Sequence, residues 1–238
     1  MTKDLLIKKV LVKILEAPLV SPFRIATGQH DVLRNVFLCL ELKNGVKGFG
    51  EAAVATHITG DTVEGTEASL RSAADGLIGH NVQECLALMI GSSVRFSRNR
   101  AAMAALEMAM ADALTRSQKI PLWELFAEGT KPGKLLTDIT IVLGDLDEAA
   151  AFAKKYVRLG FKTFKIKLGQ DHDLDLKRIL AVKKVAPKAS IILDANQAFT
   201  AVAMLAFLKK LKAKKVVPAL LEQPVPKKDW DGLRELTR

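Results

Sequence analysis

Two lysines stand close together in the short stretch Thr163–Leu168, which reads T-F-K-I-K-L. In a strand, successive side chains point to opposite faces, so Lys165 and Lys167 would share one face, and Phe164 and Ile166 the other. Two ammonium groups on an inward face need acidic partners, because an isolated buried charge is costly. The stretch therefore predicts carboxylates close by and a site with chemistry of its own.

Acidic partners stand at the ends of the two apolar runs that follow. The stretch I-I-L-D-A-N contains Asp194 and Asn196, and L-L-E-Q-P contains Glu222. Asp194 comes about one strand–helix repeat after Lys167, and Glu222 about one repeat after Asp194. In a βα-barrel the carboxyl ends of the strands converge on one mouth, where active sites are found. We therefore expect these two acids to meet the lysine pair, although Asp194 alone would also suit a helix cap.

This set of side chains predicts a particular kind of chemistry. Two carboxylates without histidine or cysteine suit a hard cation such as Mg²⁺. A lysine that faces both a divalent cation and a second lysine has its pKa lowered by like charge, which allows it to accept a proton. We therefore predict the removal of a proton alpha to a carboxylate, with the metal stabilising the resulting enediolate.

The residues before the lysine pair predict a region of strands followed by helices. Asn44 and Gly45 stand between two apolar runs, which is typical of a hairpin turn. The predicted strands cover 6–15, 32–42 and 46–54; the predicted helices cover 62–77, 98–115 and 121–126; and 128–134 reads as a linker. This region, 1–130, is predicted to be a separate domain.

The second predicted domain, 134–238, alternates strands with helices. Repeated βα units of this kind imply a parallel sheet or barrel. The predicted strands cover 137–143, 163–168, 190–193 and 219–221, and the predicted helices cover 146–159, 174–185, 200–211 and the residues from 230 onward.

The composition favours a globular protein. It is 49% hydrophobic and 26% charged, and no apolar run approaches the roughly 20 residues that a membrane-spanning helix needs. The net charge of +10 comes from scattered lysines without interleaved aromatic residues, so we expect no nucleic-acid or membrane partner. Cys39 and Cys85 fit no metal motif and are expected to be reduced thiols in a cytoplasmic protein.

The motifs resemble those of a known group of enzymes. T-F-K-I-K-L-G, L-D-A-N-Q and L-L-E-Q-P resemble the K-x-K, D-A-N and E-Q-P signatures of the enolase superfamily, in its muconate-lactonizing branch. G-F-G-E-A-A at 48–53 and I-T-G-D-T at 58–62 resemble the capping-domain loop of dipeptide epimerases, the L-Ala-D/L-Glu epimerase group. The resemblance implies an α/β fold: an α+β N-terminal capping domain, then the first half, about four βα units, of an enolase-type modified TIM barrel.

The resemblance also implies an isomerase that epimerises a dipeptide by 1,1-proton transfer and depends on Mg²⁺. Lys167 would then be a catalytic acid/base, and Lys165 would hold the substrate carboxylate and tune Lys167. Asp194 and Glu222 would be two of three metal ligands, with Asn196 supporting them.

Other residues are expected, by the same resemblance, to contact the substrate. Thr140 matches a substrate-binding threonine, and loops near Arg24 and near His57 would close over the dipeptide. Members specific for Ala–Glu carry an arginine where this chain has Gly28, so glutamate specificity is not implied. Arg24 could take the place of that arginine only from a different position.

The resemblance places a third metal carboxylate and an opposing lysine on later strands, which these 238 residues do not include. A homo-oligomer is expected where the barrel is complete. Two alternatives stay open from the sequence. One is a cycloisomerase or an o-succinylbenzoate synthase-like member of the same superfamily. The other is a non-catalytic half-barrel that needs a partner chain.

Overall fold

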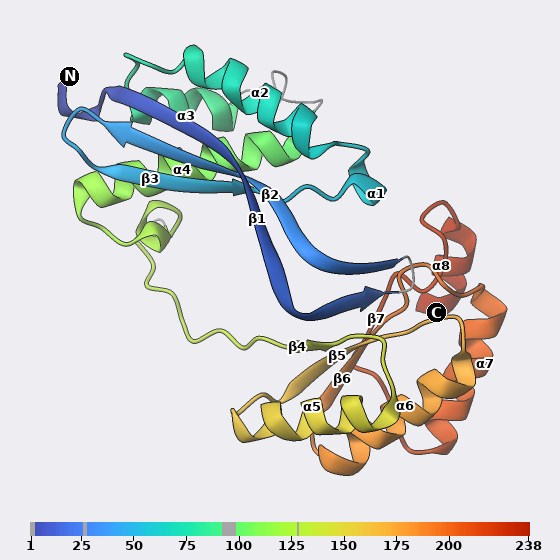
Figure 1. The fold of residues 1–238 in the computed structure, drawn as a ribbon. Helices are drawn as coiled ribbons and strands as arrows, with labels where there is room; N and C mark the ends of the chain where they lie inside the picture. The colour runs from blue at the N-terminus through green and yellow to red at the C-terminus, as the bar shows by residue number, and fades with distance from the viewer. Residues whose placement is uncertain (1–2, 26–27, 92–98, 128) are drawn as a thin grey trace. The chain divides into compact units, whose positions relative to one another are not determined.

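The computed structural model describes residues 3–25, 28–91, 99–127 and 129–238. The chain forms two compact units (Figure 1). The first contains Met1–Pro18 and Val32–Lys134, and the second contains Leu19–Asp31 and Leu135–Arg238. The segment Leu19–Asp31 therefore belongs to the second unit, whereas the sequence analysis includes it in the first predicted domain, between two predicted strands.

The first unit is built on a three-stranded sheet in the order β1-β2-β3. β2 (Gly28–Leu42) and β3 (Lys47–Ala52) are antiparallel, and the turn between them contains Gly45 at a φ of 83°. This confirms the predicted hairpin. β1 (Ile7–Ile25) is longer than predicted, because it continues beyond Leu15 into the second unit.

Helices cover one face of this sheet (Figure 1). Two of them were not predicted: α1, over 56–59, and α3, over 82–91. The predicted helix over 121–126 is a short 3-10 helix. Two predicted positions lie outside the described residues: Arg98, where the helix over 98–115 was predicted to begin, and Glu128 of the predicted linker. The helical elements are η1 (Lys3–Leu5), α1 (Thr56–Thr59), α2 (Val63–Asp75), α3 (Val82–Gly91), α4 (Arg100–Gln118) and η2 (Leu122–Leu125).

The close approach of β3 to α4 depends on small residues. A Cβ atom on Gly50 would collide with the backbone of Ala105, and one on Gly48 would collide with the backbone of Ala109. Leu38 and Leu40 are fully buried in the apolar core of this unit. The unit is thus held by tight apolar packing between one sheet face and α4.

The second unit contains a parallel sheet in the order β4-β5-β6-β7, with a helix after each strand. This confirms the predicted alternation of strands and helices. The strands are β4 (Ile139–Ile141), β5 (Thr163–Lys167), β6 (Ser190–Asp194) and β7 (Leu220–Glu222), and the helices are α5 (Leu146–Arg158), α6 (His172–Val185), α7 (Ala201–Ala213) and α8 (Trp230–Thr237). Side-chain caps begin each helix, from Asp145, Asp171, Thr200 and Asp229.

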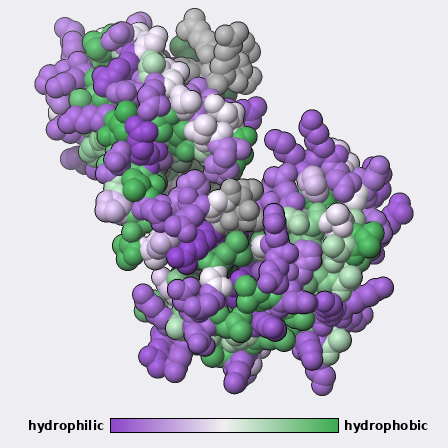
Figure 2. All heavy atoms as spheres, turned by 45° about the vertical axis from the view of Figure 1, so that its right-hand side comes forward, coloured by the Kyte–Doolittle hydropathy of each residue, from purple (hydrophilic) through white to green (hydrophobic). Residues whose placement is uncertain are grey.

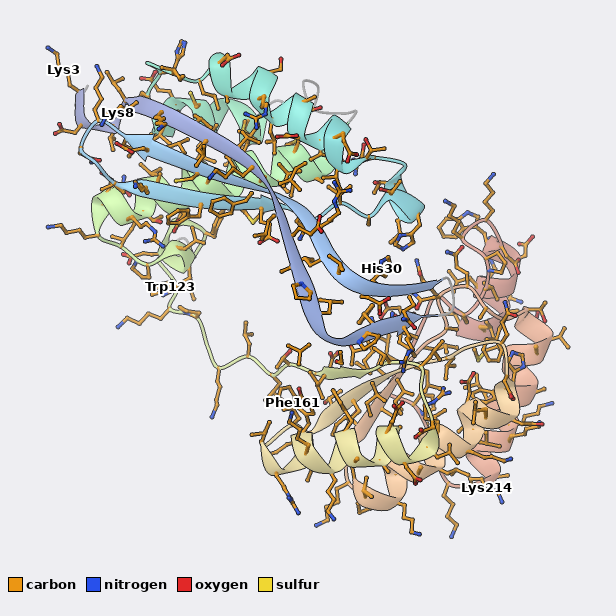
Figure 3. All side chains as sticks on the ribbon, in the orientation of Figure 1. Lys3, Lys8, His30, Trp123, Phe161 and Lys214 are labelled. Carbon is orange, nitrogen blue, oxygen red and sulfur yellow. The ribbon has the colours of Figure 1, made fainter. Side chains whose placement is uncertain are left out.

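The helices pack against the apolar face of this sheet (Figure 1), where Phe164, Ile166 and Leu193 are fully buried. Phe161, labelled in Figure 3, packs against the same core. Hydrophilic side chains project around the visible surface of the second unit (Figure 2). Lys214, labelled in Figure 3, is exposed. The opposite face of the sheet carries the polar residues singled out from the sequence.

Candidate functional site

Two rows of side chains lie on the polar face of the second sheet. In the first row Thr140 of β4 is in register with Lys165 of β5. In the second row Lys167 of β5 is in register with Asp194 of β6, which is in register with Glu222 of β7. Because side chains alternate along a strand, Lys165 and Lys167 share this face. The strand ends therefore bring both lysines and both acids together at one edge of the sheet.

The four side chains form one connected ion-pair network. Lys165 Nζ lies 2.9 Å from Asp194 Oδ2 and 2.7 Å from Glu222 Oε2. Lys167 Nζ lies 2.6 Å from the same Asp194 oxygen and donates a 3.0 Å hydrogen bond to Asn196 Oδ1. The Asp194 side chain is 1% exposed, whereas that of Glu222 is 40% exposed. Asp194 is thus the buried centre of the network, and Glu222 lies at its open side.

The network shifts the ionisation of its members. Burial alone would raise the pKa of Asp194, but hydrogen bonds from Lys167 and Lys165 and from the Asn196 backbone hold it below its ordinary value. Burial alone would lower the pKa of Lys165, but its bonds to Glu222 and Asp194 raise it above the ordinary value. In the absence of a bound cation, the carboxylates therefore keep Lys165 protonated.

The loops after β6 and β7 adopt a backbone that few residues other than glycine adopt. Asn196, Gln197 and Gln223 have φ values of 43°, 72° and 41°. The Gln197 backbone N–H donates to the Gln223 carbonyl at 2.8 Å, and the Lys227 N–H donates to Gln197 Oε1 at 2.8 Å. Such positions are concentrated at functional sites. The two glutamines were not predicted as site residues, although they stand in the motifs L-D-A-N-Q and L-L-E-Q-P, directly after the polar strand ends.

Arg24 lies in the second unit, where its side chain has partners other than the lysines and acids of the ion-pair network. Its Nε donates to Gln29 Oε1 at 3.1 Å, and its Nη1 lies 3.8 Å from Glu148 Oε2. It lines a hollow of about 210 Å³ together with Ile141, whose side chain is on the helix-covered face. Arg24 is therefore already partnered by an acid and an amide.

His57 lies in the first unit, exposed on α1. The segment from His57 to Thr59 was predicted to be a loop, and this was wrong: it is a single helical turn. That turn ends at Gly60, which has a φ of 82° and whose N–H donates to the Thr56 carbonyl. Thr62 then caps α2 by accepting a hydrogen bond from the Gly65 N–H. The local hydrogen bonds of the I-T-G-D-T segment thus explain why α1 ends at this segment and why α2 begins directly after it.

The donor set fits part of a hard-cation site. Asp194 and Glu222 present carboxylate oxygens from neighbouring strands in register, and both are drawn to the Lys165 ammonium. Within the described ranges no group of three or more His, Cys, Asp and Glu residues is placed to hold a metal ion. The described residues therefore supply two oxygen-donor side chains, of the type that Mg²⁺ prefers.

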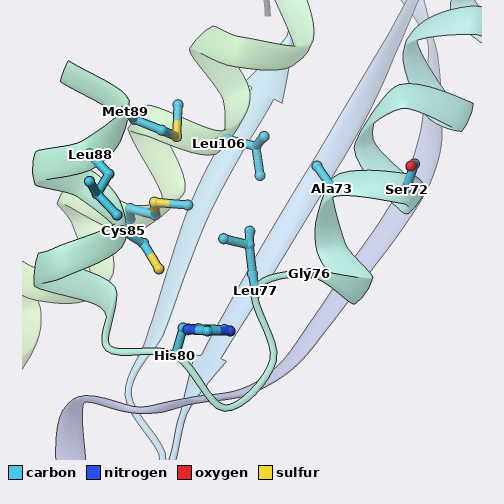
Figure 4. Close-up of a pocket in the computed structure, with 10 residues that line it drawn as sticks. Ser72, Ala73, Gly76, Leu77, His80, Cys85, Leu88, Met89 and Leu106 are labelled. Atoms are coloured by element: carbon cyan, nitrogen blue, oxygen red, sulfur yellow. The ribbon is translucent and has the colours of Figure 1, made fainter. Parts of the chain in front are cut away.

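A separate hollow of about 390 Å³ lies in the first unit, between α2, α3 and α4 (Figure 4). Its walls are mainly apolar, with Leu77, Met89 and Leu106 among them, and His80 and Cys85 also line it. Burial, with a smaller effect of the neighbouring Glu84, raises the pKa of the Cys85 thiol. A raised pKa disfavours the reactive thiolate, so Cys85 is not an activated nucleophile.

None of the helices in the described part of the chain combines the length and apolar composition that crossing a bilayer requires.

Comparison with known families matches both units. The family model "Mandelate racemase / muconate lactonizing enzyme, N-terminal domain" matches residues 9–127, and "Enolase C-terminal domain-like" matches residues 148–238. The two models follow each other along the chain in the order of the two predicted domains.

Three relatives illustrate the similarity. A hydrophobic dipeptide epimerase of Citrifermentans bemidjiense is 53% identical over 234 residues, which cover 97% of this chain and 64% of the relative. An aromatic dipeptide epimerase of Herpetosiphon aurantiacus is 37% identical, with 97% and 65% covered. The crystal structure of the Enterococcus faecalis dipeptide epimerase, complexed with Mg and L-Leu-L-Tyr, has a TM-score of 0.85 at 30% identity, with 97% and 64% covered. The chain thus spans just under two thirds of the length of these relatives.

Proposed function

The chain belongs to the mandelate racemase/muconate lactonizing enzyme family, and on that premise we propose that it carries the catalytic base and two metal ligands of a Mg²⁺-dependent dipeptide epimerase whose substrates are hydrophobic. The observation that carries this proposal is the ion-pair network on the polar face of β5, β6 and β7. It joins Lys165 and Lys167 to Asp194 and Glu222 at the strand ends.

Lys167 is proposed as the acid/base group on one face of the substrate alpha carbon. In its neutral form it would take the alpha proton, and epimerisation is completed when a proton is delivered to the opposite face. Its Nζ is fixed by Asp194 and Asn196, at 2.6 and 3.0 Å, so its direction is set before substrate binds. Fixed orientation of this kind lowers the entropic cost of proton transfer.

Asp194 and Glu222 are proposed to hold Mg²⁺. When bound, the metal would supply positive charge that stabilises the negative charge developing on the substrate carboxylate. Dipeptide epimerases from three bacteria among the solved structures contain Mg, which supports this assignment. Lys165 would give up its contacts with the two acids when they hold a cation, and its ammonium would then be available to the substrate carboxylate.

The proposed substrate class rests on two observations. The relative that is 53% identical is a hydrophobic dipeptide epimerase. In addition, Arg24 is occupied by Gln29 and Glu148, and Gly28 offers no charge to a glutamyl side chain. A dipeptide with an acidic side chain would therefore find no unpaired cation at either of these two positions.

The proposal is tested with the full-length protein in D₂O with Mg²⁺, following the alpha-proton signals by NMR. We expect L-Ala-L-Leu to exchange its alpha proton and epimerise at least about 10-fold faster than L-Ala-L-Glu, since loss of complementary apolar contacts costs 10-fold or more. Asp194→Asn should abolish exchange. Asp173→Asn, a change at an exposed acid paired with Lys210, should leave it unchanged.

Two results would contradict parts of the proposal. A preference for L-Ala-L-Glu would overturn the substrate class while leaving the reaction in place. Absence of exchange with a panel of dipeptides, combined with turnover of a succinylbenzoate precursor, would overturn the reaction itself and favour the o-succinylbenzoate synthase-like alternative.

A further inference from the structure

A separate ion pair is buried in the second unit. It joins two residues that lie one helical turn apart on α6. Arg178 Nη1 donates to Asp175 Oδ1 at 2.6 Å, and the two side chains are 3% and 2% exposed. Neither residue belongs to the ion-pair network of Lys165 and Lys167. Full burial of two opposite charges away from that network requires an explanation, because surface-type helix ion pairs are normally solvated.

The remaining hydrogen bonds of this pair go to two loops at the carboxyl ends of strands. Arg178 Nε donates to the Gly144 carbonyl at 3.0 Å, in the loop after β4. The Gly169 backbone N–H donates to Asp175 Oδ2 at 2.8 Å, in the loop after β5. One side-chain pair on α6 therefore connects the segments that follow Thr140 and Lys167.

The connection to Lys167 is short. Gly169 follows Lys167 by two residues, and the Leu168 N–H between them donates to the Asp194 carbonyl at 2.8 Å. The backbone on the C-terminal side of Lys167 is thus held from two directions, by β6 and by Asp175. A shift of Gly169 would be transmitted to the Lys167 backbone through only two peptide units.

Helix stability alone does not account for the pair. Asp171 already caps α6 by accepting a hydrogen bond from the Leu174 N–H, so Asp175 is not needed as a cap. Burial raises the pKa of Asp175 more than its bonds to Gly169 and Arg178 lower it. Replacing a buried ion pair by apolar residues of similar volume is often neutral or stabilising. On this general ground stability does not require the charged pair, so its contacts with the two loops are the feature to be explained.

We propose that Asp175 and Arg178 are positioning residues, which fix the loops after β4 and β5 and thereby the place of the Lys167 ammonium against the substrate. The proposal rests on the proposed function for its effect on catalysis. It predicts that the pair matters for proton transfer through its two loop contacts, and not only through the mutual attraction of its charges.

Arg178→Lys separates these two roles. A lysine keeps the positive charge beside Asp175 but cannot make the forked contacts to both Asp175 and the Gly144 carbonyl. In the full-length protein we expect a thermal midpoint close to that of the wild type and a kcat for alpha-proton exchange about 10- to 100-fold lower, because small displacements of a catalytic group have effects of this size. KM should change less than kcat.

The double variant Asp175→Leu/Arg178→Met guards against misfolding. It replaces both charges by apolar side chains and removes the acceptor of the Gly169 N–H, so it should fold, lose protection of the Gly169 amide from hydrogen exchange, and show the same fall in kcat. Arg234→Met is the matched control, because Arg234 pairs with Asp231 at the same 2.6 Å and the same spacing but is exposed. It should leave kcat and Gly169 protection unchanged.

The outcomes distinguish this proposal from the proposed function. A double variant with wild-type kcat and a protected Gly169 amide would overturn the positioning role, as would losses of kcat that merely follow thermal stability. If the wild type exchanges no dipeptide alpha proton, the proposed function fails. In that case, faster hydrogen exchange of the Gly169 amide in the double variant would still support the loop-fixing role. Unchanged protection of that amide would overturn it.

Discussion

The two units bury different kinds of polar side chain. Among the described residues of the first unit, the buried polar side chains are neutral: Asn35, Thr66, Asn99 and Thr115. Among those of the second unit they are charged: Lys167, Asp175, Arg178 and Asp194. Neutral groups are satisfied by one or two local hydrogen bonds, whereas buried charges need an opposite charge as well as hydrogen bonds. The difference indicates that the polar core residues of the first unit serve packing, whereas the second unit retains buried charges; the proposed function gives those charges a role in chemistry.

Among the substitutions that test this difference between the units, Asp194→Ala is expected to lower stability the most. It leaves the Lys165 and Lys167 ammonium groups without the carboxylate they share, and breaking a buried pair costs about 4 kcal/mol. The loss should appear in amide hydrogen exchange of the second unit. Asp194→Asn, which keeps the shape, should lose less stability but equally abolish Mg²⁺ binding measured by calorimetry. Unchanged amide hydrogen exchange in both variants would show that the ion-pair network contributes little to the stability of the second unit.

Gly50→Ala tests the packing side of the comparison. The added Cβ would collide with the Ala105 backbone of α4, and overpacking of a rigid site costs about 3 kcal/mol. Amide exchange should speed up in the first unit, while alpha-proton exchange of a dipeptide should keep its kcat at a temperature where the variant is folded. Gly133→Ala, at a site with open space around it, is the control. Equal effects of the two substitutions would contradict the account.

Asn99→Ala should have a smaller effect, on the order of 2 kcal/mol, because it removes a helix cap and one buried hydrogen bond. Asn99 Oδ1 accepts from the Ala102 N–H at 2.8 Å, and its Nδ2 donates to Thr66 Oγ1 at 2.9 Å. Asn99→Ser keeps a capping oxygen and loses the contact with Thr66, so chemical denaturation should place it between the wild type and the alanine variant.

The pH dependence of stability should be the smallest difference between the units. The pKa of Asp194 is held below its ordinary value of 3.8. Its ionised form therefore stabilises the folded state at neutral pH, and this contribution is lost as pH falls below that value. Without Mg²⁺, acid titration followed by amide exchange should weaken the second unit in this range, and Asp194→Asn should lack that part of the loss. An identical acid profile for the variant would remove Asp194 as the cause.

Much of the second unit could be predicted from the sequence, because each short strand is bounded by clear turn and cap residues. The first unit was harder. β1 continues through Pro18 and Pro22, and proline normally argues against a strand. α3 was missed because Val82–Gly91 is apolar around much of its surface and lacks a clear helical stripe.

The candidate site divides in the same way. Lys165, Lys167, Asp194 and Glu222 were predictable because their strand-end spacing repeats with the βα unit. Asp175 was not, since an acid in the first turn of a helix is expected to be solvated and favoured by the helix dipole. Only the fold shows that it is buried against Gly169.

The most direct test of the account is deuterium incorporation at the alpha carbon of L-Ala-L-Leu and its epimer by the full-length Lys167→Ala variant. We expect exchange from one stereoisomer to fall by about 10³-fold, as for loss of an acid/base group, while the fold is retained. Lys210→Ala, at an exposed lysine in the same unit, is the control and should exchange both isomers at the wild-type rate. Wild-type exchange of both isomers by Lys167→Ala would contradict the assignment of Lys167 as the base.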